Sequence, residues 1–220
     1  MSRRSAILSP EIAEYLTAHS AQPDEVLADL AAETVRLFPG HSGMQIGADQ
    51  GALMTMLTRL AGARSALEVG TFTGYSSICI ARGLALGGHL TCCDVSDEWT
   101  AVARRYWAAA GLDDRIELRL GAALDTLRAM PAQPHLDLAF IDADKAGYGG
   151  YWAEIVPRIR PGGIILVDNT LQNGKVADPG AELSGNVVAI REFNDQVAAD
   201  DRVDVALLPV GDGLTLAIRR

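Results

Sequence analysis

The sequence predicts an α/β domain built on an open, mostly parallel sheet. From residue 65 onward, short apolar segments of strand length alternate with segments of helical patterning, the order of a parallel sheet with crossover helices. The last two strand segments, 203–208 and 214–218, are joined only by residues 209–213. Parallel strands need a dozen or more linking residues, so this short connection indicates a hairpin. We therefore expect the last strand to be antiparallel.

Length and composition favour one domain that acts on a small molecule. The chain has 220 residues, of which 49% are hydrophobic and 21% are charged. The net charge of −9 argues against a nucleic-acid partner. No apolar run approaches the roughly 20 residues that span a membrane, and no signal-type apolar core follows the N-terminus. We expect a cytoplasmic protein without a membrane segment.

The N-terminal part has helical patterning over residues 9–38. Ser9 is the expected N-cap of a first helix with Pro10 at its first position, and a second helix starts near Asp24. We expect residues 1–60 to form a lid or dimer element over a core at 61–220, within one domain of 1–220. A simple cover for one face of that core is the alternative. A further helix is predicted over 49–60, capped by Ala48 or Asp49.

The core alternates strands and helices in sequence order. The predicted strands span residues 66–69, 89–93, 116–120, 136–141, 164–167, 203–208 and 214–218. The predicted helices span residues 76–86, 97–110, 122–130, 150–159 and 186–199. Cys79, Cys92 and Cys93 form an odd set with two adjacent members, which suits neither a disulfide framework nor a zinc site. We expect three buried thiols.

A glycine turn follows the first predicted strand and opens a helix. Its sequence runs from Glu68 through Gly70 and Gly74 to Ser76. Glycines let a ligand approach the backbone, and the helix N-terminus favours a carboxylate or a phosphate. The pattern is neither G-x-G-x-x-G nor a P-loop, which disfavours dinucleotide and triphosphate ligands. A purely structural turn is the alternative.

Two further strand ends carry candidate ligand contacts. Asp94 ends the second predicted strand, where an acidic side chain can accept both hydroxyls of a ribose. Nicotinamide and S-adenosylmethionine sites share this feature. Gly121 and Ala122 follow the third predicted strand and would leave room beside an adenine ring. A plain junction of loop and helix explains them equally well.

Oxygen ligands gather after the fourth and fifth predicted strands. Asp142, Asp168 and Asn169 would meet at one edge of a parallel sheet, with no histidine or cysteine beside them. Such a set suits magnesium, calcium or manganese rather than zinc. Strand-end turn residues are the alternative for Asp168 and Asn169, and helix capping for Asp142 or Asp144. Lys145 is one of only two lysines, the other being Lys175.

Taken together, these motifs resemble the cation-dependent, S-adenosylmethionine-dependent O-methyltransferases, the group that contains caffeoyl-CoA and catechol O-methyltransferases. The resemblance runs from about Met44 to the C-terminus. It implies a Rossmann-like, doubly wound sheet of seven strands with an antiparallel last strand, the class I methyltransferase fold. It also implies a homodimer. The motifs that carry it are Met44-Gln45-Ile46, Glu68-Val69-Gly70 through Tyr75-Ser76, Asp94, Gly121-Ala122, Ile141-Asp142-Ala143-Asp144-Lys145, Val167-Asp168-Asn169 and Gly211-Asp212-Gly213-Leu214.

The resemblance assigns a role to each of these residues. The implied ligands of a divalent cation, Mg²⁺ foremost with Mn²⁺ or Ca²⁺ as alternatives, are Asp142, Asp168 and Asn169. Lys145 is the implied base, and Asp142 also faces the amino group of the cofactor. The implied contacts to S-adenosylmethionine are Met44, Ile46, Glu68, Gly70 and Ser76 around its methionine part, Asp94 at the ribose and Ala122 at the adenine, with Phe72 and Tyr75 as further cofactor contacts.

The expected reaction is methyl transfer to a hydroxyl of a catechol-type molecule, in secondary metabolism. Animal catechol enzymes of this group carry a glutamate where this chain has Pro209, so the chain looks closer to the caffeoyl-CoA-like and bacterial branch. Substrate contacts are expected from residues 1–45 and 171–184. A nicotinamide-dependent oxidoreductase and a non-catalytic S-adenosylmethionine-binding protein are the alternatives. Trp99, Trp107 and Trp152 are interpreted as helix packing, with Trp152 as a possible substrate contact.

Overall fold

The core of the protein is a sheet of seven strands in the order β3-β2-β1-β4-β5-β7-β6. The computed structural model describes residues 8–178, 180 and 185–220. Strand β7 is antiparallel to both of its neighbours, and the other pairings are parallel. The predicted α/β class and the antiparallel last strand are therefore confirmed. The strands are β1 (Ser65–Val69), β2 (His89–Asp94), β3 (Ile116–Leu120), β4 (Leu136–Ile141), β5 (Ile159–Val167), β6 (Val203–Leu208) and β7 (Leu214–Arg219).

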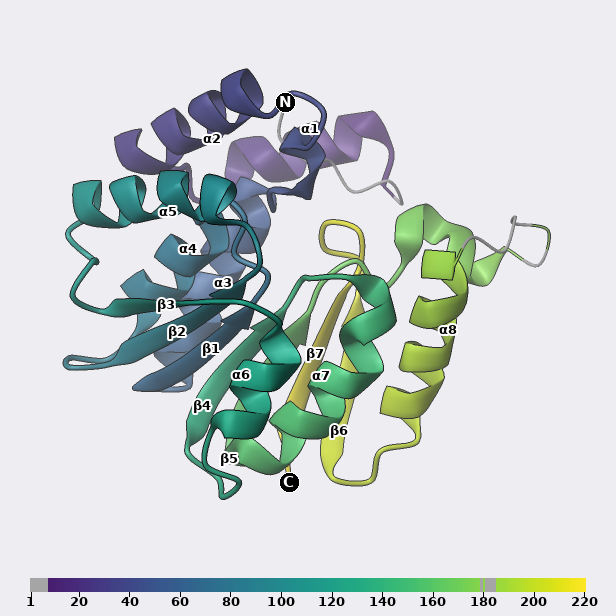
Figure 1. Ribbon diagram of the computed structural model, residues 1–220. Coiled ribbons are helices and arrows are strands. Elements are labelled where there is room, and N and C mark those ends of the chain that lie inside the picture. Colours follow the sequence, from purple (N-terminus) through teal and green to yellow (C-terminus); the bar gives the residue numbers. More distant parts are fainter. Residues whose placement is uncertain (1–7, 179, 181–184) are drawn as a thin grey trace.

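Helices cover both faces of the sheet, as Figure 1 shows. One face carries α3 (Ala48–Leu60), α4 (Tyr75–Gly83) and α5 (Asp97–Ala109). The other carries α6 (Ala123–Ala129), α7 (Tyr148–Ile155) and α8 (Gly185–Ala198). Each face has its own apolar core, because alternate strand residues point to opposite sides: Glu68 lies between Leu67 and Val69, which pack against the α6–α8 layer.

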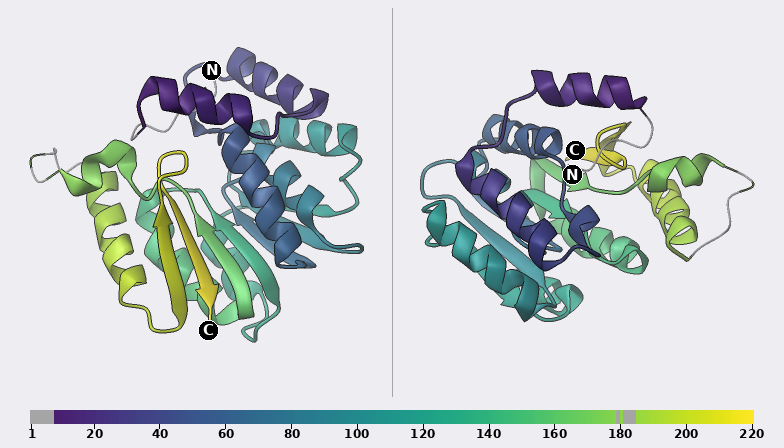
Figure 2. Two further views of the ribbon diagram at one scale, coloured as in Figure 1. Left: turned by 180° about the vertical axis from the view of Figure 1, so that it is seen from behind. Right: turned by 90° about the horizontal axis from the view of Figure 1, so that it is seen from above.

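Two N-terminal helices lie at the end of the sheet where the parallel strands finish (Figures 1 and 2). Helix α1 (Pro10–His19) is capped by Ser9, whose side chain accepts a hydrogen bond from the Ile12 N–H. Helix α2 (Glu25–Leu37) is capped by Asp24, which accepts from the Leu27 N–H. Both predicted starts are confirmed, because a cap acts through neighbours in sequence.

The structure moves several predicted boundaries. Helix α3 is capped by Gly47 rather than by Ala48 or Asp49, and α4 ends at Gly83 instead of continuing to residue 86. The helix predicted over 150–159 begins earlier and ends at Ile155, and a 3₁₀ turn, Val156–Arg158, follows it. Strand β5 therefore starts at Ile159, five residues early, and a register shift against β4 absorbs the Pro-Gly-Gly segment.

Two composition-based expectations have direct counterparts in the structure. Cys79, Cys92 and Cys93 are buried and free, as predicted. No helix within the described residues is both long and apolar enough to cross a bilayer. The substrate contacts expected from residues 1–45 and 171–184 fall partly outside the described residues, because 1–7, 179 and 181–184 are not among them.

Candidate functional site

A cavity of about 690 Å³ lies at the carboxyl ends of the parallel strands. Its wall includes most of the predicted site residues, which come from the loops after β1, β2, β3, β4 and β5 and from the segment before α3. Those in the wall are Met44, Ile46, Gly70, Phe72, Tyr75, Ser76, Asp94, Ala122, Asp142, Lys145 and Asn169. Glu68 and Asp168 are not in the wall, and both are fully buried.

The strand ends are aligned by backbone hydrogen bonds that continue one residue beyond each strand. The Asp142 N–H donates to the Val69 carbonyl at 2.8 Å, and the Asp168 N–H donates to the Ile141 carbonyl at 3.0 Å. This register brings Gly70, Asp142 and Asp168 side by side at one edge. The sequence places these residues far apart, and the parallel pairing joins them.

Two glycines of the turn after β1 have different structural roles. Gly70 has a φ of +92°, and a Cβ there would lie 2.1 Å from the Asp142 carbonyl oxygen. Gly74 also has a φ of +92°, and its Cβ would meet Ala103 of α5 at 2.8 Å. Gly70 thus allows two strand ends to touch beside the cavity. Gly74 allows close packing against α5, in agreement with the alternative that glycines of this turn are structural. At Gly121 a Cβ would meet no atom within 4 Å.

Asp94 fixes the same turn from the neighbouring strand. One carboxylate oxygen accepts from the backbone N–H groups of Thr71 at 2.9 Å and Phe72 at 2.8 Å. The other accepts from the Ser96 N–H at 2.8 Å. Phe72 has a φ of +50°, a conformation that ordinary residues rarely adopt, so these bonds hold a strained turn. Asp94 therefore has a structural task besides any contact with a ligand.

Glu68 is a buried carboxyl beneath this turn. Burial raises the pKa of Glu68 to about 7, because the charged form loses its hydration. The nearby polar side chains of Ser76, Cys92 and Thr71 oppose this rise in pKa in part. The Cys92 thiol lies 3.3 Å from Glu68 Oε2. Burial therefore favours the protonated form of this carboxyl group.

Lys145 is held over Asp142 by three acceptors. Its Nζ donates to Asp142 Oδ1 at 3.0 Å, to the Ala143 carbonyl at 3.0 Å and to the Tyr148 hydroxyl at 2.6 Å. The Tyr148 hydroxyl in turn donates to the Asp168 carbonyl at 3.0 Å. The Lys145 and Asp142 side chains are only 14% and 13% exposed. Tyr148 was missed by the sequence reasoning, although it follows Lys145 by three residues, a helical spacing.

The donor set of Asp142, Asp168 and Asn169 fits a hard divalent cation. Two carboxylates and an amide oxygen are the ligands that Mg²⁺, Mn²⁺ and Ca²⁺ prefer. Asn169 has a φ of +60° and lines the cavity, and within the described chain its buried Nδ2 has no hydrogen-bond partner. Among the described residues, no three His, Cys, Asp or Glu side chains gather as a metal site.

Asp144 is a cavity residue that the sequence reasoning considered only as a helix cap. It precedes the 3₁₀ turn Lys145–Gly147 but makes no side-chain capping bond. Instead its Oδ1 accepts from the Tyr151 hydroxyl at 2.5 Å, and both residues line the cavity. The capping interpretation is therefore wrong for Asp144.

The tryptophans are placed differently from expectation. Trp99 lines the cavity and packs edge-on against Phe72, with 5.2 Å between the ring centroids, so it is more than helix packing. Trp152 is fully buried outside the cavity wall and donates to Asp200 Oδ2 at 2.8 Å. Its interpretation as a substrate contact is not supported by this position. Trp107 is buried and donates to Ser77, as packing predicts.

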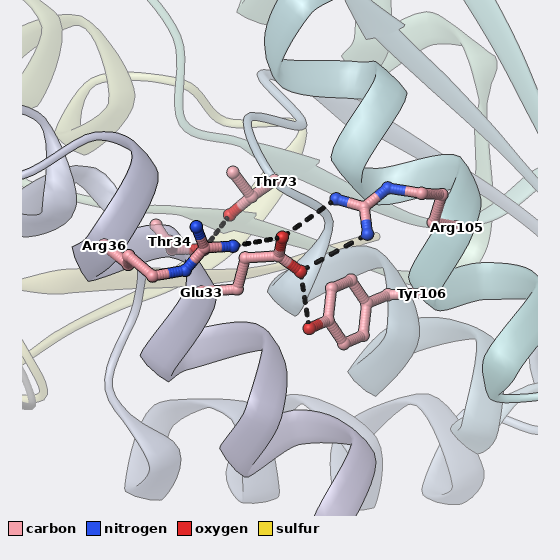
Figure 3. A network of polar contacts seen from close by, with 6 residues as sticks. All are labelled: Glu33, Thr34, Arg36, Thr73, Arg105 and Tyr106. Carbon is pink, nitrogen blue, oxygen red and sulfur yellow. Dashed lines mark hydrogen bonds and ion pairs between the residues drawn. The ribbon is translucent and has the colours of Figure 1, made fainter.

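A polar network attaches α2 to the glycine turn and to α5, as Figure 3 shows. The buried Thr34 hydroxyl donates to the buried Thr73 hydroxyl at 2.9 Å. The residue before Thr34 in α2 is Glu33. Its carboxylate accepts hydrogen bonds from the Tyr106 hydroxyl at 2.8 Å and from the Arg105 guanidinium. The N-terminal helix α2 thus supports the turn that borders the cavity, a link that no local sequence signal indicates.

Comparison with known proteins gives similarity over nearly the whole chain. Residues 17–220 match the O-methyltransferase family. The chain is 40% identical over 208 residues to the probable caffeoyl-CoA O-methyltransferase 2 of Dictyostelium discoideum, covering 93% of this chain and 90% of the relative. The solved O-methyltransferase from Bacillus cereus in complex with SAH has a TM-score of 0.85 and 31% identity, over 96% of this chain and 97% of that one.

A second solved structure adds a cofactor complex. TomG from Streptomyces achromogenes, an O-methyltransferase involved in tomaymycin synthesis, was solved in complex with SAM. It has a TM-score of 0.85 and 32% identity to this chain, and the match covers 95% of this chain and 96% of TomG. The seven strands and the residues that line the cavity lie within residues 17–220, the part that the family matches.

Proposed function

The chain belongs to the O-methyltransferase family and is an S-adenosylmethionine-dependent enzyme, and on that premise we propose that it methylates a catechol-type molecule with the help of a divalent cation. The observation that carries the proposal is the position of Lys145 Nζ, 3.0 Å from Asp142 Oδ1 at the cavity wall where Asn169 also lies. Family membership decides against the oxidoreductase and the non-catalytic alternatives.

The cofactor would occupy the part of the cavity bordered by the turn after β1. Ser76, Met44 and Ile46 line the wall where the methionine part would lie, above buried Glu68. The open space beside Gly121 and Ala122 would take the adenine ring, with Asp94 close to the ribose. The support for this placement is that a Cβ on Gly121 would enter open space.

The cation would be held by Asp142, Asp168 and Asn169. The chemistry that a bound cation would supply here is Lewis acidity, which lowers the pKa of an acceptor hydroxyl. The residues themselves supply the geometry. Asp168 Oδ1 accepts the backbone N–H of Asn169 at 2.7 Å, which restricts the orientation of the Asp168 side chain.

Lys145 would take the proton of the acceptor hydroxyl. Its Nζ must be uncharged when it acts, and it becomes an ammonium when the proton arrives. The methyl carbon then forms a bond to the phenolate oxygen while its bond to the sulfonium sulfur breaks, which leaves S-adenosylhomocysteine. The hydrogen bonds to Tyr148 and the Ala143 carbonyl restrict the lysine to one position and thereby reduce the entropy cost of the step.

An assay over a panel of aromatic diols tests the proposal. The purified protein is incubated with S-adenosylmethionine and either vicinal diols, including free catechols and CoA thioesters, or their single-hydroxyl analogues. We expect methylation of vicinal diols only, loss of activity in EDTA and recovery with Mg²⁺. Activity that survives EDTA, or equal rates on the single-hydroxyl analogues, contradicts the proposal.

The proposal extends to the assembly, the location and the metabolic role of the protein. A homodimer and a role in secondary metabolism are proposed from the resemblance to the family, and the cytoplasmic location expected from the sequence stays a proposal. Pro209, where animal catechol enzymes have a glutamate, is exposed and outside the cavity wall, so the second substrate hydroxyl would depend on the cation. Light scattering of the purified protein checks the dimer.

A further inference from the structure

One fully buried amide near the candidate cation site has its hydrogen-bonding capacity unused. Gln50 lies in the first turn of α3 and has no exposed surface. Within the described part of the chain, neither its Oε1 nor its Nε2 has a hydrogen-bond partner. Burying an unpaired amide costs free energy, and such groups in folded proteins point to an absent ligand, ion or water.

The turn between β6 and β7 brings Gln50 and Asp168 to one place. A Cβ on Gly211 would lie 2.5 Å from Gln50 Oε1 and 3.9 Å from Asp168 Oδ1. The same turn is fixed to the chain after β5, because the Thr170 N–H donates to the Gly213 carbonyl at 3.0 Å. Gly211 therefore leaves a space in which the Gln50 amide and the Asp168 carboxylate converge.

Packing alone does not explain a glutamine here. Thr58 lies on the same helix and is also fully buried, but its hydroxyl donates to the Met54 carbonyl of its own helix at 2.7 Å. The hydrogen-bonding capacity of Thr58, which only fills the core, is thus satisfied within helix α3 itself. Gln50, which faces the strand ends, is left with both amide atoms available for another group.

We propose that Gln50 is a positioning residue whose amide N–H donates to the Asp168 carboxylate when a divalent cation is bound. Side chains behind the direct ligands orient them and tune metal affinity. The amide would then donate to a carboxylate oxygen that the cation does not use. This inference rests on the proposed function, since it assumes a cation at Asp168.

Metal affinity of a Gln50→Met variant tests the inference. The thioether keeps the length of the side chain and removes the donor. Calorimetric titration with Mn²⁺, at saturating S-adenosylhomocysteine, should give an affinity about ten- to a hundred-fold weaker than wild type. Affinity for S-adenosylhomocysteine and the melting temperature without metal should change little. Thr58→Val, at the other buried polar position of α3, should bind Mn²⁺ like wild type.

The outcomes separate the two proposals. Wild-type protein that binds no Mn²⁺ contradicts the proposed function and this inference with it. Mn²⁺ binding by wild type and by Gln50→Met with equal affinity contradicts the role of Gln50 alone. If the Gln50→Met variant does not fold, an NMR titration of the wild-type protein with Mg²⁺ tests the inference instead. The Gln50 side-chain ¹⁵N–¹H₂ signals should shift and exchange more slowly when Mg²⁺ is added, and unchanged signals overturn the inference.

Discussion

Gly70 and Asp142 touch through their backbones, so closely that a Cβ on Gly70 would lie 2.1 Å from the Asp142 carbonyl oxygen. The two residues directly follow neighbouring parallel strands, β1 and β4, at the point where the strand order reverses. Ligands of open α/β sheets bind at this position. The contact therefore joins the glycine turn, bordering the proposed cofactor site, to the loop that carries Lys145.

A Gly70→Ala substitution should separate these two strand ends. Alanine at a φ of +92° is strained by about 1 kcal/mol, and the clash with Asp142 adds to that cost. We expect a lower melting temperature and affinity for S-adenosylmethionine reduced at least tenfold, measured by calorimetry. Gly87→Ala is the control, because Gly87 has a φ of +73° and an open surrounding. Equal effects of the two substitutions would refute the steric explanation.

A Lys145→Met substitution should abolish most of the activity without unfolding the protein. A positioned general base contributes roughly a hundred- to ten-thousand-fold in rate, so we expect a fall in kcat of that size. Binding of S-adenosylmethionine should persist, since Lys145 contacts Asp142 and Tyr148 rather than the glycine turn. Lys175→Met, at the other, exposed lysine, is the matched control. If the Lys145→Met enzyme is as fast as wild type, Lys145 is not the proton acceptor.

The stability of the protein should depend on pH through Glu68. Burial raises the pKa of Glu68 to about 7 in the folded state, against an ordinary value of 4.5. Between these values the unfolded chain has lost the proton and the folded chain keeps it, so stability falls as pH rises. The stabilisation is complete below pH 4.5 and lost above about pH 7. The loss amounts to roughly 3 kcal/mol.

A Glu68→Gln variant isolates this effect. Urea unfolding at pH 5 and pH 8 should show a wild-type stability that declines relative to the variant as pH rises. Glu14→Gln, at an exposed position of α1, should follow wild type at both values. A constant difference between wild type and Glu68→Gln across this range would mean that the pKa of Glu68 is not raised.

A Thr34→Val substitution should loosen α2 from the glycine turn. The hydroxyl of Thr73, buried in that turn, would lose its partner, at a cost of about 1–3 kcal/mol. We expect lower stability and a higher KM for S-adenosylmethionine, measured by urea unfolding and by initial rates. Thr58→Val removes an equally buried hydroxyl that bonds only within its own helix, and it should have the smaller effect. An unchanged KM for S-adenosylmethionine would show that α2 does not support the cofactor site through this hydrogen bond.

Helix caps and the terminal hairpin could be predicted because their causes are local. Ser9 and Asp24 accept hydrogen bonds from residues three positions ahead. Connection length alone gave the antiparallel pairing of β6 and β7. The predicted ends of strands and helices were wrong where pairing with a distant part of the chain sets the boundary. Strand β5 starts at Ile159 because that residue pairs with Leu136 of β4, and no pattern near Pro161 indicates it.

The sequence by itself determined the fold class and the residue types of the candidate site, since strand ends, glycine turns and oxygen ligands are local signals that a parallel sheet brings to one edge. Tertiary structure alone decided which side chains touch. Tyr148 links Lys145 to the backbone carbonyl of Asp168, and the turn at Gly211 lies beside both Asp168 and Gln50, which is more than a hundred residues earlier in the chain. Such contacts depend on packing between distant elements, because hydrogen-bond geometry in three dimensions leaves no periodic trace along the chain.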